Sequence, residues 1–364
     1  MNTESNTPIS AKPVNRFQEL DALRGIAALI VVLFHLSMWR EAAPYLSFGV
    51  AGVDLFFIIS GFVIMKSLSD IKTGGEFIIK RFTRLFPTYW VCVTLTSIGI
   101  LLLMYFLPAY QNDIGWGKYF ANMTMLQRYF YYDNIDGPYW TMALELVFYT
   151  LMLLLFYLRL LKYAVWILLA LSIGMVLLTH LHWTADEMIF IAYVPVLEYI
   201  ALFLAGLVLY KMYVERKFYW YYYVLVVGCY FMQLSQFHTT VHANAFISFR
   251  EYVVTLGVFF TLLLLFVHGR LGFIVNPVTL FLGKISYSLY LIHQFVSIGV
   301  IVPLMGTYVG YWWAAFGIAL PVAIGLGTLI TYTVEIPAGK RWKRFLYAKF
   351  ITKKPANTEV LTGL

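Results

Sequence analysis

The sequence predicts an all-α polytopic membrane protein, a bundle of about ten transmembrane helices with both termini in the cytoplasm. Three observations lead to this fold class. Hydrophobic residues make up 61% of the 364 residues and charged residues only 12%, whereas soluble proteins carry roughly 25% charged residues. Apolar runs long enough to cross a bilayer, about 20 residues each, recur along the chain. Lys and Arg gather in alternate links between these runs, as the positive-inside rule describes.

The apolar runs give ten predicted spans, and most of the links between them are short. The predicted spans are residues 17–38, 48–66, 86–107, 138–158, 163–181, 188–210, 219–237, 250–268, 279–302 and 309–334. The first run is longer than the core of a signal peptide, about 7–15 residues, so we expect an uncleaved span. The long link at residues 108–137 is rich in aromatic residues, and we expect part of it to form an interfacial helix.

The distribution of charge predicts the orientation and the domain boundaries. A cytoplasmic N-terminus puts 20 of the 26 Lys and Arg residues on the cytoplasmic side. The chain then divides into a cytoplasmic tail (1–16), a membrane domain (17–334) and a basic cytoplasmic tail (335–364). The net charge of +8 reflects this topology, so it indicates no nucleic-acid partner. Both cysteines lie in apolar runs and no metal-ligand spacing occurs, so we expect neither a disulfide framework nor a metal site.

Ionisable residues in the first span are the first indication of function, because inserting one into a membrane costs about 2.5–3.5 kcal/mol. Arg24 and His35 lie eleven residues apart. That spacing is close to three helical turns, so both side chains share one face, about 16 Å apart along the axis. Asp21 lies one turn before Arg24 on roughly the same face. We therefore expect this face to line a conduit inside the bundle.

Three more ionisable residues are predicted near the depth of His35, in the outer half of the membrane. Asp54 lies in the second span, Glu145 about two turns into the fourth, and His293 toward the outer end of the ninth. Each also has a structural alternative. Asp54 could brace the start of its helix, Glu145 could pair with an internal arginine, and His293 could make an interhelical hydrogen bond.

A basic cluster precedes the third predicted span, on the predicted cytoplasmic side. Lys80, Arg81 and Arg84 come just before Pro87, and the two arginines are neighbours on a helix. Guanidinium groups bind phosphates bidentately, so the pair favours a phosphorylated ligand. Alternatively, these basic residues set the orientation of the chain in the membrane or contact anionic lipid. Together with Arg24 and His35, the cluster suits a long anionic donor held by its phosphates in the cytoplasm.

At these residues the chain resembles the acyltransferase 3 family of integral membrane O-acyltransferases, the type that acetylates O-antigens and exopolysaccharides. The resemblance covers nearly the whole chain. It rests on the order and spacing of six strings, "LDALRGIAAL", "GVDLFFIISGF", "KRFTRLFPTYW", "YWTMALELVFY", "SYSLYLIH" and "EIP".

The resemblance implies roles for individual residues. His35 matches the essential histidine of the family and Arg24 its partner, while Arg81 and Arg84 match the pair thought to engage coenzyme A. Glu145 matches an acidic residue of the fourth-helix motif. An imidazole at His35 could take a proton from an attacking sugar hydroxyl.

Two further site residues follow from the predicted topology. We expect Asp54 to take part in catalysis, and either Asp54 or Glu145 to fix the tautomer of His35. His293 is expected in the substrate pocket.

The predicted function is therefore transfer of an acyl group, taken as acetyl, from cytoplasmic acetyl-CoA to a hydroxyl of an extracytoplasmic polysaccharide or glycolipid. Acetyl-CoA acts as a co-substrate, and no metal is expected. The expected partners are membrane lipid and a glycan or lipid-linked saccharide, and the expected location is the bacterial inner membrane. Two alternatives remain open, a different acyl group and a secondary transporter or flippase. Transporters often contain inverted repeats with broken helices, and no such repeat is visible in the sequence.

Overall fold

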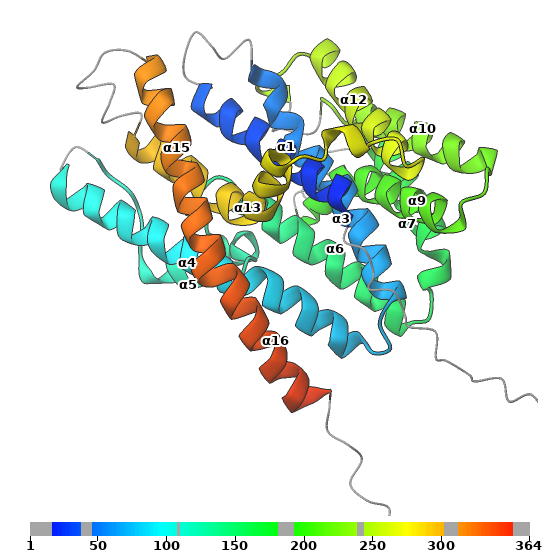
Figure 1. The fold of residues 1–364 in the computed structure, drawn as a ribbon, viewed down its shortest axis with the longest axis horizontal. Coiled ribbons are helices and arrows are strands. Elements are labelled where there is room, and N and C mark those ends of the chain that lie inside the picture. The colour runs from blue at the N-terminus through cyan, green and yellow to red at the C-terminus, as the bar shows by residue number, and fades with distance from the viewer. Residues whose placement is uncertain are drawn as a thin grey trace, which may run out of the picture.

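The computed structural model describes residues 17–37, 46–107, 110–180, 193–238, 244–301 and 312–351. Helices make up most of these residues, and none of them forms a strand (Figure 1). The predicted N-terminal tail (1–16) and the last part of the predicted C-terminal tail (352–364) lie outside the described residues. The all-α fold class is confirmed for the described residues.

The α-helices keep the labels of Figure 1. They are α1 (Gln18–Ser37), α3 (Gly52–Ser69), α4 (Gly74–Phe106), α5 (Trp116–Met123), α6 (Tyr139–Tyr157), α7 (Ala164–His180), α9 (Ile200–Glu215), α10 (Trp220–Ser235), α12 (Phe249–Val267), α13 (Pro277–Gln294), α15 (Trp312–Ile330) and α16 (Ile336–Phe350). Short 3-10 helices are η1 (Ser47–Ala51), η2 (Gln127–Phe130), η3 (Leu161–Tyr163), η4 (Pro195–Tyr199) and η5 (Gly272–Ile274). Two π-helical segments are η6 (Phe295–Ile301) and η7 (Thr331–Glu335).

Eight helices within the described ranges are long and apolar enough to cross a membrane, so the chain is a multi-pass membrane protein. Each of the ten predicted spans overlaps a helix, but α10 and α13 are not among the eight. Helix α10 has 16 residues, and α13 carries Lys284 and His293. The count of ten and the cytoplasmic placement of both termini stay predictions.

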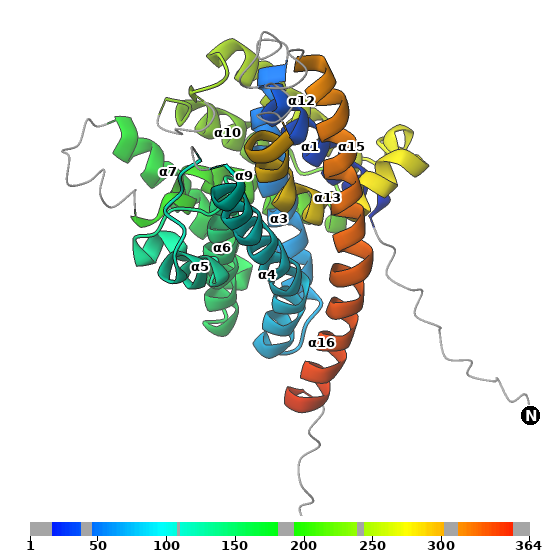
Figure 2. The same ribbon diagram turned by 90° about the vertical axis from the view of Figure 1, so that its left-hand side faces the viewer.

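Two helices are longer than the sequence predicted. The third predicted span began at residue 86, whereas α4 begins at Gly74 and continues through Pro87. The predicted C-terminal tail begins as helix, because α15, η7 and α16 form one rod over residues 312–350 (Figure 2). At 1.5 Å per residue this rod is about 58 Å long, roughly twice the hydrocarbon core of a bilayer.

Helices α1 and α13 pack against each other more extensively than any other pair. Two glycines allow this close approach. A Cβ at Gly25 would lie 2.5 Å from the backbone nitrogen of Gly283, and a Cβ at Gly283 would lie 2.1 Å from the carbonyl oxygen of Asp21. Small residues at helix contacts let backbones approach in this way. The contact brings the polar faces of two distant segments together.

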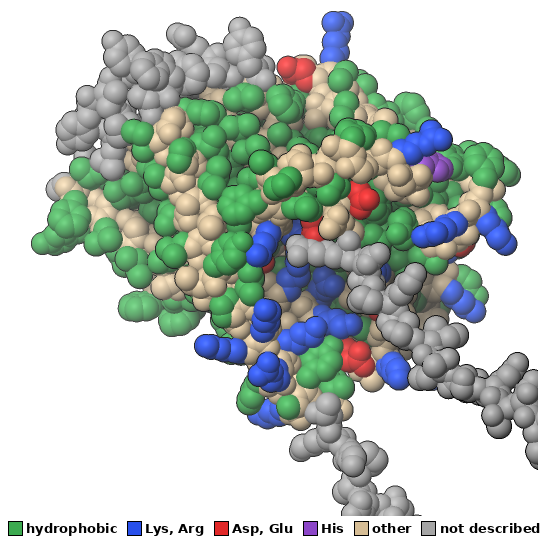
Figure 3. Space-filling view, in the orientation of Figure 1, with side chains coloured by type: hydrophobic (Ala, Val, Ile, Leu, Met, Phe, Trp, Pro, Cys, Tyr) green, Lys and Arg blue, Asp and Glu red, His purple; other side chains and the backbone are tan. Residues whose placement is uncertain are grey.

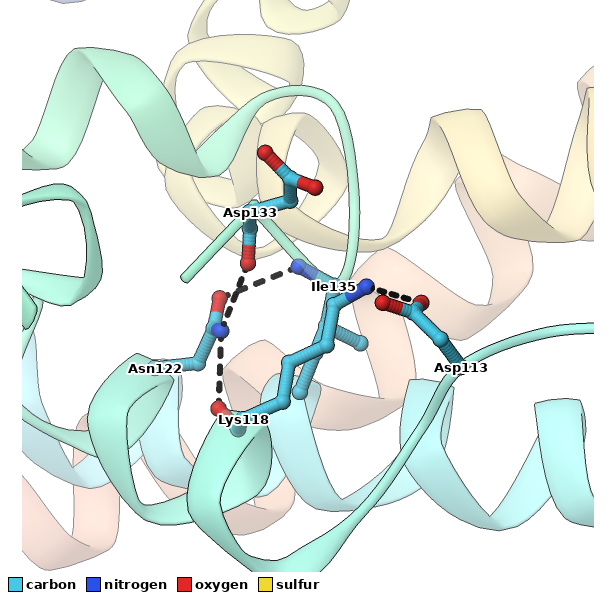
Figure 4. A network of polar contacts seen from close by, with 5 residues as sticks. All are labelled: Asp113, Lys118, Asn122, Asp133 and Ile135. Atoms are coloured by element: carbon cyan, nitrogen blue, oxygen red, sulfur yellow. Dashed lines mark hydrogen bonds and ion pairs between the residues drawn. The ribbon is translucent and has the colours of Figure 1, made fainter. Parts of the chain in front are cut away.

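The long link between α4 and α6 is organised around one buried amide (Figure 4). Asn122 of α5 donates through Nδ2 to the carbonyl oxygens of Lys118 and Asp133, at 2.9 and 3.0 Å, and accepts from Ile135 N at 3.0 Å. Lys118 forms an ion pair with Asp113. The helix expected in this link is confirmed as α5, and the bonds fix the segment that leads into α6.

Candidate active site

The larger of two neighbouring cavities, which we call the arginine cavity, has a volume of about 560 Å³ and is lined by α1, α3, α4, α6 and α13. Its charged lining residues are Asp21, Arg24, Lys66, Arg81, Arg84 and Glu145. The pattern predicted from sequence, in which Arg24 and the Arg81–Arg84 pair come together, is present in this cavity.

The guanidinium of Arg81 is held by two aromatic rings. Its central carbon lies 5.5 Å from the ring centroid of Phe77 and 5.6 Å from that of Tyr149, within the range of a cation–π contact. Its buried Nε has no hydrogen-bond partner among the described residues. Arg81 is therefore oriented by packing, with donor capacity left for a ligand in the cavity.

Arg24 and Glu145 face the same cavity from opposite helices. Arg24 lies 3.8 Å from Asp21, so its closest ion pair is a loose one. Glu145 accepts hydrogen bonds from Ser60 Oγ at 2.9 Å and from the hydroxyl of Tyr149. Tyr149 thus orients Arg81 through its ring and Glu145 through its hydroxyl.

The smaller cavity, which we call the histidine cavity, has a volume of about 150 Å³. His35 and Asp54 line it, together with aromatic side chains. Asp54 is only 4% exposed, and one of its carboxylate oxygens, Oδ2, has no hydrogen-bond partner among the described residues. A side-chain hydrogen bond joins Asp54 to Tyr252. A buried carboxylate oxygen without a donor is costly, so a donor on a bound ligand would be strongly favoured there.

His35 contacts a second histidine. Its Nδ1 lies 2.9 Å from the carbonyl oxygen of Val31 and 3.2 Å from Nε2 of His293. A carbonyl oxygen can only accept a hydrogen bond, which assigns the proton of His35 to Nδ1 and makes Nε2 its basic nitrogen. His293 donates from Nδ1 to Tyr290 O at 2.8 Å, so its Nε2 can accept from His35. The fully buried His293 therefore supports the tautomer of His35.

The two cavities are neighbours, because Val53 and Tyr290 line both of them. The hydroxyl of Tyr290 bonds to Thr141 Oγ1 at 3.0 Å, and its ring contacts Phe56 with centroids 5.6 Å apart. Tyr290 is thus fixed at the boundary between the arginines on one side and His35 on the other.

A buried carboxyl in the loop before α6 joins this loop to the end of α13. Asp136 accepts from Gly137 N at 2.8 Å and from Phe295 N at 3.3 Å, where α13 passes into η6. Burial raises the pKa of this carboxyl to about 7. The neighbouring residues Gly137 and Gln294 line the histidine cavity, so Asp136 fixes one wall of that cavity.

The structure distributes the predicted site residues over both cavities. Arg24, Arg81, Arg84 and Glu145 line the arginine cavity, and His35 and Asp54 line the histidine cavity. His293, predicted in the substrate pocket, contacts Nδ1 of His35 and is not among the residues that line either cavity. The sequence predicted one depth for His35, Asp54, Glu145 and His293, but Glu145 belongs to the other cavity. It also predicted a carboxylate as the partner that fixes His35, whereas Val31 and His293 contact Nδ1.

Sequence reasoning missed several polar residues of the site, among them Ser60, Tyr149, Tyr252, Tyr290 and Asp136. Tyr149 lies four residues after Glu145, and this spacing puts both on one helical face. That signal was available in the sequence. For Ser60 and Tyr290 no local spacing indicates a role. Among the described residues, no group of three or more His, Cys, Asp or Glu side chains could hold a metal ion.

Comparison with known proteins identifies the family. The Acyltransferase domain matches residues 17–333. Over 143 residues the chain is 30% identical to the O-acetyl transferase of Shigella phage Sf6, a match that covers 35% of this chain and 43% of that protein. Nodulation protein 10 of Rhizobium leguminosarum is 28% identical over 151 residues, covering 35% and 41%. The peptidoglycan O-acetyltransferase OatA of Listeria monocytogenes is 27% identical over 154 residues, covering 36% and 22%.

These matches span less than half of each relative's length, and no solved structure matches the chain. The family profile, in contrast, extends over all the helices that line the two cavities. The resemblance predicted from the six strings is confirmed, and the chain belongs to the acyltransferase family defined by this domain.

Proposed function

We propose that the protein is a membrane O-acyltransferase that moves an acetyl group from cytoplasmic acetyl-CoA to a hydroxyl of an extracytoplasmic polysaccharide or glycolipid. Family membership and the names of the O-acetyltransferase relatives support the reaction class. The proposed location is the bacterial inner membrane. The donor, the acceptor and the residue roles rest on the arrangement of the two cavities.

The arginine cavity is the proposed binding site for the donor. Arg24, Arg81 and Arg84 line it, and guanidinium groups form bidentate hydrogen bonds with phosphate oxygens. The volume of about 560 Å³ falls in the range of cofactor sites, about 300–1,000 Å³. Glu145, held by Ser60 and Tyr149, attracts Arg24 and Arg81 through its charge.

The contact between the two cavities supports passage of the thioester from one to the other. Because Val53 and Tyr290 border both, a donor bound by its phosphates among the arginines would extend its acyl end past Tyr290 toward His35. This shared boundary is the observation that carries the proposal. The proposed phosphate-binding cavity and the cavity that contains the His35 imidazole therefore border the same two residues.

At His35 the proposed step is general base catalysis. Nε2 takes the proton of the acceptor hydroxyl while its oxygen attacks the thioester carbonyl carbon. The carbon–sulfur bond then breaks, and the coenzyme A thiolate takes the proton back from the imidazolium. His293 accepts the hydrogen bond from His35 Nδ1 and keeps the basic nitrogen on the reacting side. Such catalysis accelerates a reaction by about 10²–10⁴.

Asp54 is the proposed anchor for the acceptor. Its unpartnered Oδ2 in the histidine cavity can accept a hydrogen bond from a second hydroxyl of the sugar. A sugar offers neighbouring hydroxyls, so one could bind Asp54 while the other meets His35.

The experiment is mass spectrometry of envelope glycans from a deletion strain complemented with the wild-type gene or with His35→Ala. The proposal predicts acetyl groups on the glycan with the wild-type gene and none with the variant, at equal protein levels in the membrane. Radiolabelled acetyl-CoA should also deliver its acetyl group covalently to the glycan. Transport of a solute without any labelling would instead identify a transporter or flippase.

A further inference from the structure

Helix α16 lies beyond the family match, which ends at residue 333, yet it packs against the segment that carries the two arginines. A Cβ at Gly339 would lie 3.3 Å from the carbonyl oxygen of Thr83, between Arg81 and Arg84 in α4. The ring of Trp342 contacts that of Phe82, with centroids 5.9 Å apart. The position of α16 relative to the basic cluster is therefore fixed by packing.

Helix α16 packs where a proline in α4 leaves a backbone carbonyl without its helical hydrogen bond. Pro87 has no amide hydrogen, so it cannot donate to the carbonyl of Thr83 four residues earlier. That carbonyl faces Gly339 of α16. The absence of a side chain at Gly339 lets the two backbones meet, which brings the next turn of α16, with Lys343, alongside Lys80.

The cations of α4 and α16 extend the group of cations that lines the arginine cavity. The charge of Arg84 is close enough to repel the charges of both Arg24 and Arg81. Lys343 and Arg81 repel the charge of Lys80, and Glu76 and Asp70 attract it. A line of cations therefore runs from the cavity to the α4-facing side of α16, at the end of the molecule where Figure 3 shows Lys and Arg side chains gathered.

Carboxylates act on this line without pairing with its lysines or with Arg81 and Arg84: Glu76 and Asp70 attract Lys80, and Glu145 attracts Arg81. Within the described ranges, no ion pair joins Lys80, Arg81, Arg84 or Lys343 to an acid. The nearby Asp70 is already paired with Lys66 at 2.5 Å. Helix α16 itself contains no Asp or Glu. Cations held together by packing, without ion pairs of their own among the described residues, favour binding of an anion.

We propose that Lys343 of α16, together with Lys80 of α4, forms a second phosphate position that binds the 3′-phosphate of coenzyme A, while Arg81 and Arg84 bind its pyrophosphate. This inference rests on the proposed function. The residue types suit the two groups, because guanidinium pairs fit the paired oxygens of a pyrophosphate and ammonium groups act as point charges toward a monoester.

The test compares acetyl-CoA with 3′-dephospho-acetyl-CoA as donors for the purified full-length protein in neutral-lipid nanodiscs. Lys343→Ala is expected to raise KM for acetyl-CoA about tenfold, the effect of losing one charge-assisted contact, with kcat unchanged. KM for the dephospho donor should stay at the wild-type value. The matched control is Arg341→Ala, two residues away on the opposite side of the same exposed helix, which should leave both KM values unchanged.

Three outcomes would overturn the inference. An equal rise of KM for both donors would mean that Lys343 supports the structure of α4, and no rise for either would mean that α16 does not bind the donor. An effect of Lys343→Ala that appears only in nanodiscs with anionic lipid, and equally for both donors, would identify a lipid headgroup as the bound phosphate.

A different result would contradict the proposed function itself, namely that the wild-type protein transfers no acetyl group from either donor. Equilibrium binding of coenzyme A and 3′-dephospho-coenzyme A to the same variants then tests the phosphate position without turnover. The inference predicts that Lys343→Ala weakens binding of coenzyme A about tenfold and that of the dephospho form not at all.

Discussion

The arginine cavity and the histidine cavity differ in how the protein satisfies their polar groups. In the arginine cavity Arg81 is oriented by two aromatic rings, and Arg24 forms only a loose ion pair with Asp21 at 3.8 Å. Lys66 is the cation with a close ion pair there, to Asp70 at 2.5 Å. In the histidine cavity the two imidazoles are fixed by backbone carbonyls and by each other. The first arrangement leaves positive charge for a ligand, and the second fixes the position of a proton.

This difference explains how one bundle can separate binding from chemistry. In the proposed function the cations determine how tightly an anionic donor is held, and they lie on one side of Val53 and Tyr290. The imidazole of His35, the proposed proton acceptor, lies on the other side. Variants of the arginine cavity should therefore change KM for the donor, whereas variants of the histidine cavity should change kcat.

The largest effect is expected from His35→Ala. Loss of the general base should lower kcat by about 10²–10⁴, with KM for acetyl-CoA within about threefold of wild type. Steady-state kinetics in nanodiscs measure both constants. His180→Ala, at the exposed end of α7, is the control. Unchanged kcat in His35→Ala would assign the chemistry to another group.

The next largest effect is expected at His293, a positioning residue that acts through His35. His293→Phe removes the acceptor for His35 Nδ1 and should lower kcat about 10–100-fold, less than the loss of about 10²–10⁴ expected for the general base itself. His293→Gln keeps an acceptor oxygen and should recover part of the loss. The pH profile of kcat should shift in the Phe variant more than in the Gln variant. Equal losses in both, with the wild-type profile, would mean that His293 only fills space.

Arg81→Lys should raise KM for acetyl-CoA about tenfold and change kcat little. Lysine keeps the charge but loses the planar guanidinium that packs between Phe77 and Tyr149 and binds phosphate bidentately. Donor binding and initial rates give the two constants. Arg250→Lys, exposed on α12, is the control. A fall in kcat at constant KM would contradict the division of roles between the cavities.

The smallest effect concerns stability and pH. Burial raises the pKa of Asp136 from 3.8 to about 7, so the folded protein binds this proton more tightly than the unfolded chain. The stabilisation is fully present below about pH 4 and is lost as pH rises toward 7. In a thermal-unfolding series in detergent, the wild-type Tm should fall over this window more than that of Asp136→Asn. Asp133→Asn, exposed in the same loop, should follow the wild type, and parallel curves for wild type and Asp136→Asn would disprove the coupling.

Local sequence patterns predicted the helices and several site residues, because these depend on spacing within one segment. The eleven-residue spacing of Arg24 and His35 places both on the side of α1 that meets the two cavities. The contact between His35 and His293 depends instead on the close approach of α1 and α13 at Gly25 and Gly283. No pattern along the chain carries that information.

The course of α16 was missed for a different reason. The tenth predicted span ends at residue 334 and the predicted tail begins at 335, two residues before Pro337. In the structure a π-helical segment, Thr331–Glu335, precedes it, and Pro337 lies at the beginning of α16. The π-helical segment accommodates the altered hydrogen bonding before the proline, so the helical rod continues.

The most direct test of the account is to block the boundary between the cavities with Val53→Trp. The added ring would occupy space that both cavities share, while Arg24, Arg81 and Arg84 stay in place. The account predicts that coenzyme A binds with wild-type affinity but that acetyl transfer is lost, whereas Val258→Trp, on the exposed face of α12, retains transfer. Transfer at the wild-type rate by the Val53→Trp protein would contradict the proposed route from the arginines to His35.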